Sequence, residues 1–126
     1  MNRPPKTGSG LSLAQEAIQL ALDKKASDPV LLDLRPLEAV SDYFAIVSAS
    51  SEVQVKAVAD HVEETLLARH QARPWHVEGR EGRHWVLLDY VDFVVHVFHE
   101  RTREYYLLER LWGDAKRIEI ADPHSA

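Results

Sequence analysis

The feature that most constrains the fold is the stretch of residues 83–98, RHWVLLDYVDFVVHVF. It contains two apolar runs, residues 85–88 and 93–98, separated by the four residues DYVD. Each run is short, nearly unbroken and rich in β-branched and aromatic residues, which is typical of strands with little face left for water. Because four residues are too few for a crossover connection, the stretch predicts an antiparallel hairpin at the centre of a sheet.

Two other segments carry apolar residues at helical spacing and predict helices, over residues 12–25 and from residue 51 to about residue 68. Each is expected to begin with a capping box, in which glutamine follows a serine by three residues. The two boxes are Ser12 with Gln15, and Ser51 with Gln54. The Asp28-Pro29 pair is expected to stop the first helix.

Short apolar runs predict three further strands, and a third helix precedes a glycine cap. The strands are expected at residues 30–34, 43–47 and 75–78, and the helix at residues 104–112 with Gly113 as its cap. The element order, α-β-β-α-β-β-β-α, predicts an α+β fold of a single domain, with a five-stranded mixed sheet and helices packed on it. The domain is expected to span residues 11–117, between a disordered N-terminal tail (residues 1–10) and a C-terminal tail (residues 118–126).

Composition narrows the possible functions. The chain has 126 residues, no cysteine and a formal net charge of −5. The absence of cysteine excludes disulfides and thiolate metal sites and fits a cytoplasmic setting. No apolar run reaches the ~20 residues of a membrane helix. An acidic chain disfavours nucleic acid as the main partner and suits a basic protein.

The polar residues allow several chemical interpretations. The turn at residues 48–51, from Ser48 to Ser51, precedes a helix and could bind an anion, although Ser51 more simply caps that helix. Asp89 and Asp92 flank the hairpin turn and could hold a divalent ion, although aspartate is also a common turn residue. Together these features give one candidate function, a nucleotide-handling enzyme. The histidines are too scattered to predict a metal site, and no cofactor is expected.

Large aromatic residues gather in the second half of the chain, and an acidic rim around them would suit a protein-binding surface. Core packing is expected to use some of them. The aromatic residues concerned are Trp75, Trp85, Tyr105, Tyr106 and Trp112.

A series of short motifs resembles the ribosomal silencing factor family, the bacterial relatives of plant iojap, from about Ser12 to Ala115. In order, the motifs are SDYF (41–44), SASS (48–51) with Gln54, AVAD (57–60), EG (78–79), WVLLD (85–89), Asp92 with VHVF (95–98), REYY (103–106), LE (108–109) and LW (111–112). No single motif is specific, but the complete series in this order is.

The resemblance implies a fold similar to that of nucleotidyltransferases, without their catalysis. It also implies a homodimer that binds a basic protein of the large ribosomal subunit, ribosomal protein L-fourteen, and blocks subunit joining when nutrients are scarce. The acidic residues after the serine turn fall on a predicted helix, which argues against transferase activity. We therefore expect no catalytic residues and a partner-binding patch of Glu78, Trp85, Leu87, Asp89 and Asp92.

One position departs from the family pattern. Val91 stands where family members often have glycine, directly before Asp92. A β-branched residue resists positive φ, so the hairpin turn is expected to differ in type from that of the family.

Overall fold

A computed structural model of the protein describes residues 3–106 and 113–120. In this part of the chain, six strands form one sheet in the order β3-β4-β5-β2-β1-β6. The strands are β1 (Ser27–Asp33), β2 (Tyr43–Ala49), β3 (His76–Glu78), β4 (Trp85–Asp89), β5 (Phe93–His99) and β6 (Lys116–Ile118). The helices are α1 (Leu11–Asp23), α2 (Glu52–His70), α3 (Glu100–Tyr106) and the 3₁₀ turn η1 (Arg35–Leu37).

The predicted hairpin is confirmed: β4 and β5 pair antiparallel in the middle of the sheet. Strand β2 pairs parallel with β5, and all other pairs are antiparallel, so the sheet is mixed and the α+β class is confirmed. The strand count is six instead of the expected five. The extra strand, β6, has only three residues of sequence Lys-Arg-Ile, and it exists because it pairs with the outer edge of β1. Nothing local in such a short polar segment indicates a strand.

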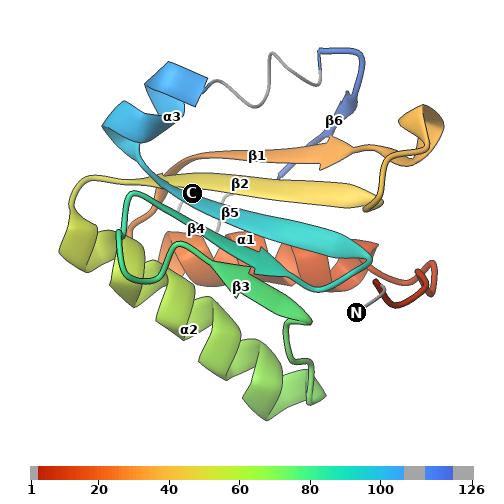
Figure 1. The fold of residues 1–126 in the computed structure, drawn as a ribbon, viewed down its shortest axis with the longest axis horizontal. Helices are drawn as coiled ribbons and strands as arrows, with labels where there is room; N and C mark the ends of the chain where they lie inside the picture. Colours follow the sequence, from red (N-terminus) through yellow and green to blue (C-terminus); the bar gives the residue numbers. More distant parts are fainter. Residues whose placement is uncertain (1–2, 107–112, 121–126) are drawn as a thin grey trace.

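The two faces of the sheet are covered differently. Helices α1 and α2 pack on the first face, where they share a continuous apolar core with alternate residues of β2, β4 and β5. The second face carries a smaller apolar cluster of Leu32, Leu34, Ile46 and Phe98. Figure 1 shows α3 at one end of the sheet and the N-terminal segment at the opposite end, where β4 turns into β5.

The two predicted capping boxes have different outcomes. At α2 the cap is confirmed, since the Ser51 side chain accepts a hydrogen bond from the Gln54 amide at 3.1 Å. The Gln54 side chain reaches back to the amide of Ser50, at 2.6 Å, instead of that of Ser51. At α1 the predicted box is wrong: the helix begins at Leu11, and its N-cap is Gly10, with no side-chain cap. Gly10 packs so closely on Asp92 that an added Cβ would lie 2.7 Å from the Asp92 Cβ, so tertiary contact fixes this start.

Several element boundaries also differ from the prediction. Strand β1 begins at Ser27, so the Asp28-Pro29 pair lies inside the strand, at an irregularity in its pairing with β2. The helix before it ends earlier, at Asp23. Helix α3 begins at Glu100, four residues before the expected start, and the rest of the predicted helix, to Trp112, lies outside the described residues.

Candidate functional site

The predicted binding residues of β4 lie on the second face of the sheet. Along β4, Val86 and Leu88 are buried against the helices, whereas Trp85 and Leu87 point the other way and are half-buried. Alternation places Asp89 on the same side as Trp85 and Leu87. Glu78 of β3 is paired directly with Leu87, and its side chain is exposed. These four residues therefore form one surface, which we call the β4 patch (Glu78, Trp85, Leu87 and Asp89).

Trp85 is held in position by two neighbours on β5. Its indole Nε1 donates a hydrogen bond to His96 Nδ1 at 3.1 Å. Its ring stacks on Phe98 at a centroid distance of 4.6 Å and an interplanar angle of 26°. A half-exposed tryptophan that is already fixed in one orientation loses little side-chain entropy on binding, which is typical of an anchor in a protein interface.

His96 is buried at the centre of this arrangement, 3% exposed. Burial lowers the pKa of its imidazole to about 3, so the ring is neutral near pH 7. Because Nδ1 accepts the Trp85 hydrogen bond, the ring proton is on Nε2, which has no hydrogen-bond partner among the residues that the structure describes. His96 thus orients Trp85 as a neutral acceptor, and the packing of Phe44 against its ring, at 4.5 Å, supports it.

Asp89 differs from the other members of the β4 patch because it is only 7% exposed. Its carboxylate accepts a hydrogen bond from the Val91 amide at 2.8 Å and a two-pronged contact from the Arg3 guanidinium, in which Nη2 lies 2.8 Å from Oδ1. The Arg3 guanidinium also lies over the Trp75 ring, 5.4 Å from its centroid. The charge of Asp89 is therefore already matched inside the chain.

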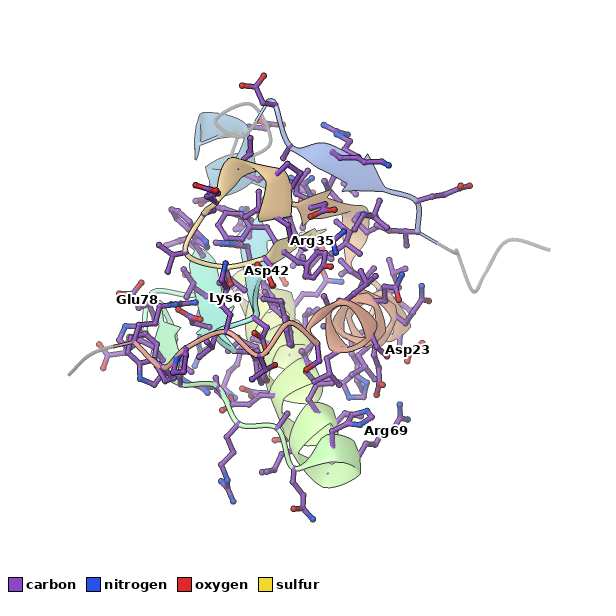
Figure 2. All side chains as sticks on the ribbon, turned by 90° about the vertical axis from the view of Figure 1, so that its right-hand side faces the viewer. Lys6, Asp23, Arg35, Asp42, Arg69 and Glu78 are labelled. Atoms are coloured by element: carbon purple, nitrogen blue, oxygen red, sulfur yellow. The ribbon has the colours of Figure 1, made fainter. Side chains whose placement is uncertain are left out.

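Two further aspartates lie at this end of the sheet and are also engaged. Asp42 receives the Lys6 ammonium at 2.9 Å, and Asp92 accepts the backbone amide and the hydroxyl of Thr7, both at 2.6 Å. We call Asp42, Asp89 and Asp92 the acidic end, and residues 3–7 the N-terminal arm. Figure 2 views this end directly and shows the arm crossing it, with Lys6 beside Asp42. Asp92, the fifth predicted binding residue, thus belongs to the acidic end.

The hairpin turn has an unusual backbone. The Asp92 amide donates to the Tyr90 carbonyl at 2.9 Å, which closes a three-residue turn around Val91. Val91 adopts a φ of 76°, so this β-branched residue takes the positive φ that glycine would adopt easily. The expected conflict at this position is therefore real, and the chain resolves it by accepting backbone strain while keeping the turn tight.

The residues proposed for nucleotide chemistry do not come together. Ser48 lies in β2 beside Phe98, and its hydroxyl accepts from the buried Arg103 side chain at 2.9 Å. The hydroxyls of Ser50 and Ser51 bond to Gln54 and complete the helix cap. Asp89 and Asp92 lie at the other end of the sheet, about 20 Å away at roughly 3.3 Å per residue of strand.

No metal site or membrane segment emerges from the residues that the structure describes. Among them, no three histidine or acidic side chains converge on a common point. The pair His76 and Glu78, 3.2 Å apart, lies on the exposed edge strand. None of the helices within residues 3–106 and 113–120 is long and apolar enough to cross a membrane.

Comparison with known proteins identifies the family. The family model described as "Ribosomal silencing factor during starvation" matches residues 7–126. The chain belongs to the ribosomal silencing factor family. The resemblance inferred from the short motifs is therefore confirmed, and the match begins inside the N-terminal arm.

Individual relatives agree with this family. A protein of Halalkalibacterium halodurans named "Ribosomal silencing factor RsfS" is 42% identical over 111 residues, which cover 84% of this chain and 93% of the relative. The chloroplastic Iojap protein of Arabidopsis thaliana is 32% identical over 110 residues, 87% of this chain and 45% of the relative. A crystal structure of a Chromobacterium violaceum protein is similar with a TM-score of 0.77 at 32% identity, covering 90% of this chain and 93% of that one.

The sequence alone did not indicate that the arm takes part in the site. The prolines and charges of residues 3–7, RPPKT, predict a disordered tail. The one available signal was charge: Arg3 and Lys6 are the basic residues of that segment, and Asp89 and Asp92 flank the turn of the central hairpin. Pairing them requires contacts across more than thirty residues, as with Lys6 and Asp42, which no local pattern reveals.

Proposed function

We propose that this protein is a translational silencer. It binds a basic protein of the large ribosomal subunit through the β4 patch and thereby blocks subunit joining when nutrients are limiting. It acts by occupying space and carries out no catalysis. Family membership supports the role, since curated relatives are named ribosomal silencing factors.

The observation that carries the proposal is the geometry of the β4 patch. Trp85 and Leu87 offer apolar area on a rigid strand, and the exposed Glu78 lies directly beside Leu87. Buried area from an aromatic anchor, surrounded by acidic groups, is the combination that suits a surface of lysine and arginine. The acid character also disfavours direct binding to ribosomal RNA, because carboxylates repel phosphates.

The experiment is co-sedimentation of the purified protein with large ribosomal subunits, followed by a subunit-joining assay. The informative variant is Glu78→Lys with Leu87→Ser, because Glu78 is exposed, Leu87 is partly exposed, and neither belongs to an apolar core cluster. We expect it to bind at least tenfold more weakly and to permit joining, since a reversed charge faces the basic partner and the apolar contact is lost.

The matched control is Glu64→Lys, which makes the same charge reversal at an exposed position of α2 on the other face. It should sediment with large subunits as the wild type does. Wild-type affinity of the folded Glu78→Lys/Leu87→Ser variant would place the interface elsewhere. If the wild-type protein itself stays in the supernatant and joining proceeds, the silencing function is wrong.

Two further properties follow from the family and belong to the same proposal. We expect a homodimer, which sedimentation equilibrium of the purified chain would detect, and a cytoplasmic location, where ribosomal subunits are found. The nucleotide-handling alternative predicts thermal stabilisation by nucleotides with magnesium, and the separation of the serine turn from Asp89 and Asp92 argues against it.

A further inference from the structure

The N-terminal arm occupies the acidic end as a basic peptide ligand would. Arg3 contributes a two-pronged contact to Asp89 and a hydrogen bond from Nη2 to the Val91 carbonyl at 2.9 Å. Lys6 bonds to Asp42 at 2.9 Å and to the Ala39 carbonyl at 3.3 Å. These are charge-assisted hydrogen bonds from two cations, three residues apart, to an acid directly before β2 and an acid at the end of β4.

The same contacts cover part of the surface that the proposed partner needs. Asp89 belongs to the β4 patch, yet its side chain, in contact with Arg3, is only 9% exposed. The Arg3 guanidinium also lies over Trp75, whose side chain is 37% exposed beside β4. A basic group from another protein can reach Asp89 only if Arg3 leaves.

The contacts between the N-terminal arm and the acidic end are weak enough for the arm to be displaced. Its polar contacts lie near the surface: the side chains of Arg3 and Lys6 are 22% and 37% exposed. Among the described residues, no apolar side chain of residues 3–10 belongs to either core cluster. An ion pair as exposed as Lys6–Asp42 contributes little net stability, and a competing arginine would restore to Asp89 the contact that Arg3 gives up.

We propose that the acidic end is a docking surface for a protein segment that carries arginine and lysine, and that the N-terminal arm occupies this surface in cis until such a segment displaces it. The arm then acts as a built-in competitor that lowers affinity for the partner and raises selectivity for one with enough basic groups to replace both Arg3 and Lys6. The identity of that partner as the ribosomal protein rests on the proposed function; the competition itself does not.

The test uses the full chain and a synthetic peptide of residues 1–10 as the probe. Peptide binding is followed by chemical-shift titration of the isotope-labelled chain at the amides of Val91 and Asp92. The variant Arg3→Ala/Lys6→Ala removes the cations of the arm. The control Lys24→Ala/Lys56→Ala also removes two positive charges, but at exposed positions at the end of α1 and near the start of α2, respectively.

We expect Arg3→Ala/Lys6→Ala to bind the peptide about tenfold more tightly than the wild type or the control, because a tethered competitor has a high effective concentration. The amide hydrogen of Thr7, which bonds to Asp92 in the wild type, should exchange with solvent faster in this variant. In the control, its exchange rate should equal that of the wild type. Equal peptide affinity in all three proteins, or no shifts at Val91 and Asp92, would overturn the proposal.

Binding to large subunits separates the two ideas. If the proposed function is right, Arg3→Ala/Lys6→Ala should also sediment with large subunits at lower protein concentration than the control. If none of the three proteins binds subunits while the peptide result stands, the acidic end still binds basic segments but the ribosomal partner is wrong. If all three bind subunits equally, the arm does not compete with the partner and the cis competition is refuted.

Discussion

Replacing Val91 by glycine should stabilise the protein, although large-to-small substitutions usually destabilise. Val91 holds a φ of 76° in the tight turn between β4 and β5. An L-residue in the left-handed region costs about 1–2 kcal/mol, and glycine avoids this cost. Glycine in turn makes the unfolded chain more flexible, which lowers stability by about 0.4–1 kcal/mol. The net gain expected from Val91→Gly is therefore about 1 kcal/mol.

Little else should offset this gain. The Val91 side chain is partly exposed and belongs to neither apolar cluster. Its backbone amide and carbonyl, which bond to Asp89, Ser41 and Arg3, remain in the glycine variant. For a domain of this size, 1 kcal/mol corresponds to a rise in Tm of about 4 °C.

The assay is urea and thermal unfolding of the wild type, Val91→Gly and a matched control, Val40→Gly. Val40 is 67% exposed and does not have a positive φ, so only the unfolded-state effect of glycine applies there. Val40→Gly should lose about 0.5–1 kcal/mol. If Val91→Gly loses as much stability as Val40→Gly, the turn is not strained and the reasoning is wrong.

Two further predictions concern the residues that support Trp85. His96 has a pKa of about 3 in the folded protein against 6.5 unfolded, so the unfolded chain binds more protons between these values and stability falls as pH drops. The control is His96→Asn, which keeps an acceptor for the indole. Between pH 7 and pH 5, the free energy of unfolding from urea titrations should fall by about 2 kcal/mol more for the wild type than for this variant. Parallel pH profiles of the two proteins would show that His96 is not buried as a neutral ring. Gly79→Ala should destabilise by about 2 kcal/mol, because Gly79 has a φ of 87° and an added Cβ would lie 1.9 Å from the Trp85 carbonyl oxygen. Gly82→Ala, where the nearest atom is 3.9 Å away, should change stability by less than about 0.5 kcal/mol, and equal effects at the two glycines would contradict the close packing of β3 on β4.

The elements that could be predicted are those whose signal is local. The β4–β5 hairpin follows from two apolar runs and a four-residue connection, and the start of α2 follows from Ser51 and Gln54. Each of these depends on residues within about five positions of one another, where periodicity and capping are informative.

The incorrect predictions occur where contacts between residues distant in the sequence determine the structure. Helix α1 begins at Leu11 instead of Ser12 because Gly10 packs against Asp92. Strand β6 forms because Ile118 pairs with Leu31 on the outer edge of β1. Residues 3–7, with the composition of a disordered tail, meet three aspartates that lie 36 to 86 positions away in the chain.

By itself, the sequence determined the fold class, the central hairpin, the family and a short set of binding candidates. It could do so because apolar periodicity and the order of motifs depend only on the order of residues in the chain. Only the tertiary structure decided which candidates share a surface. Side chains alternate along a strand, so the register of β3, β4 and β5 was needed to put Glu78, Trp85 and Leu87 together. The tertiary structure also showed that Asp89 and Asp92 are held by Arg3 and Thr7. The sequence could not show this, because electrostatic pairing depends on distance in space and not along the sequence.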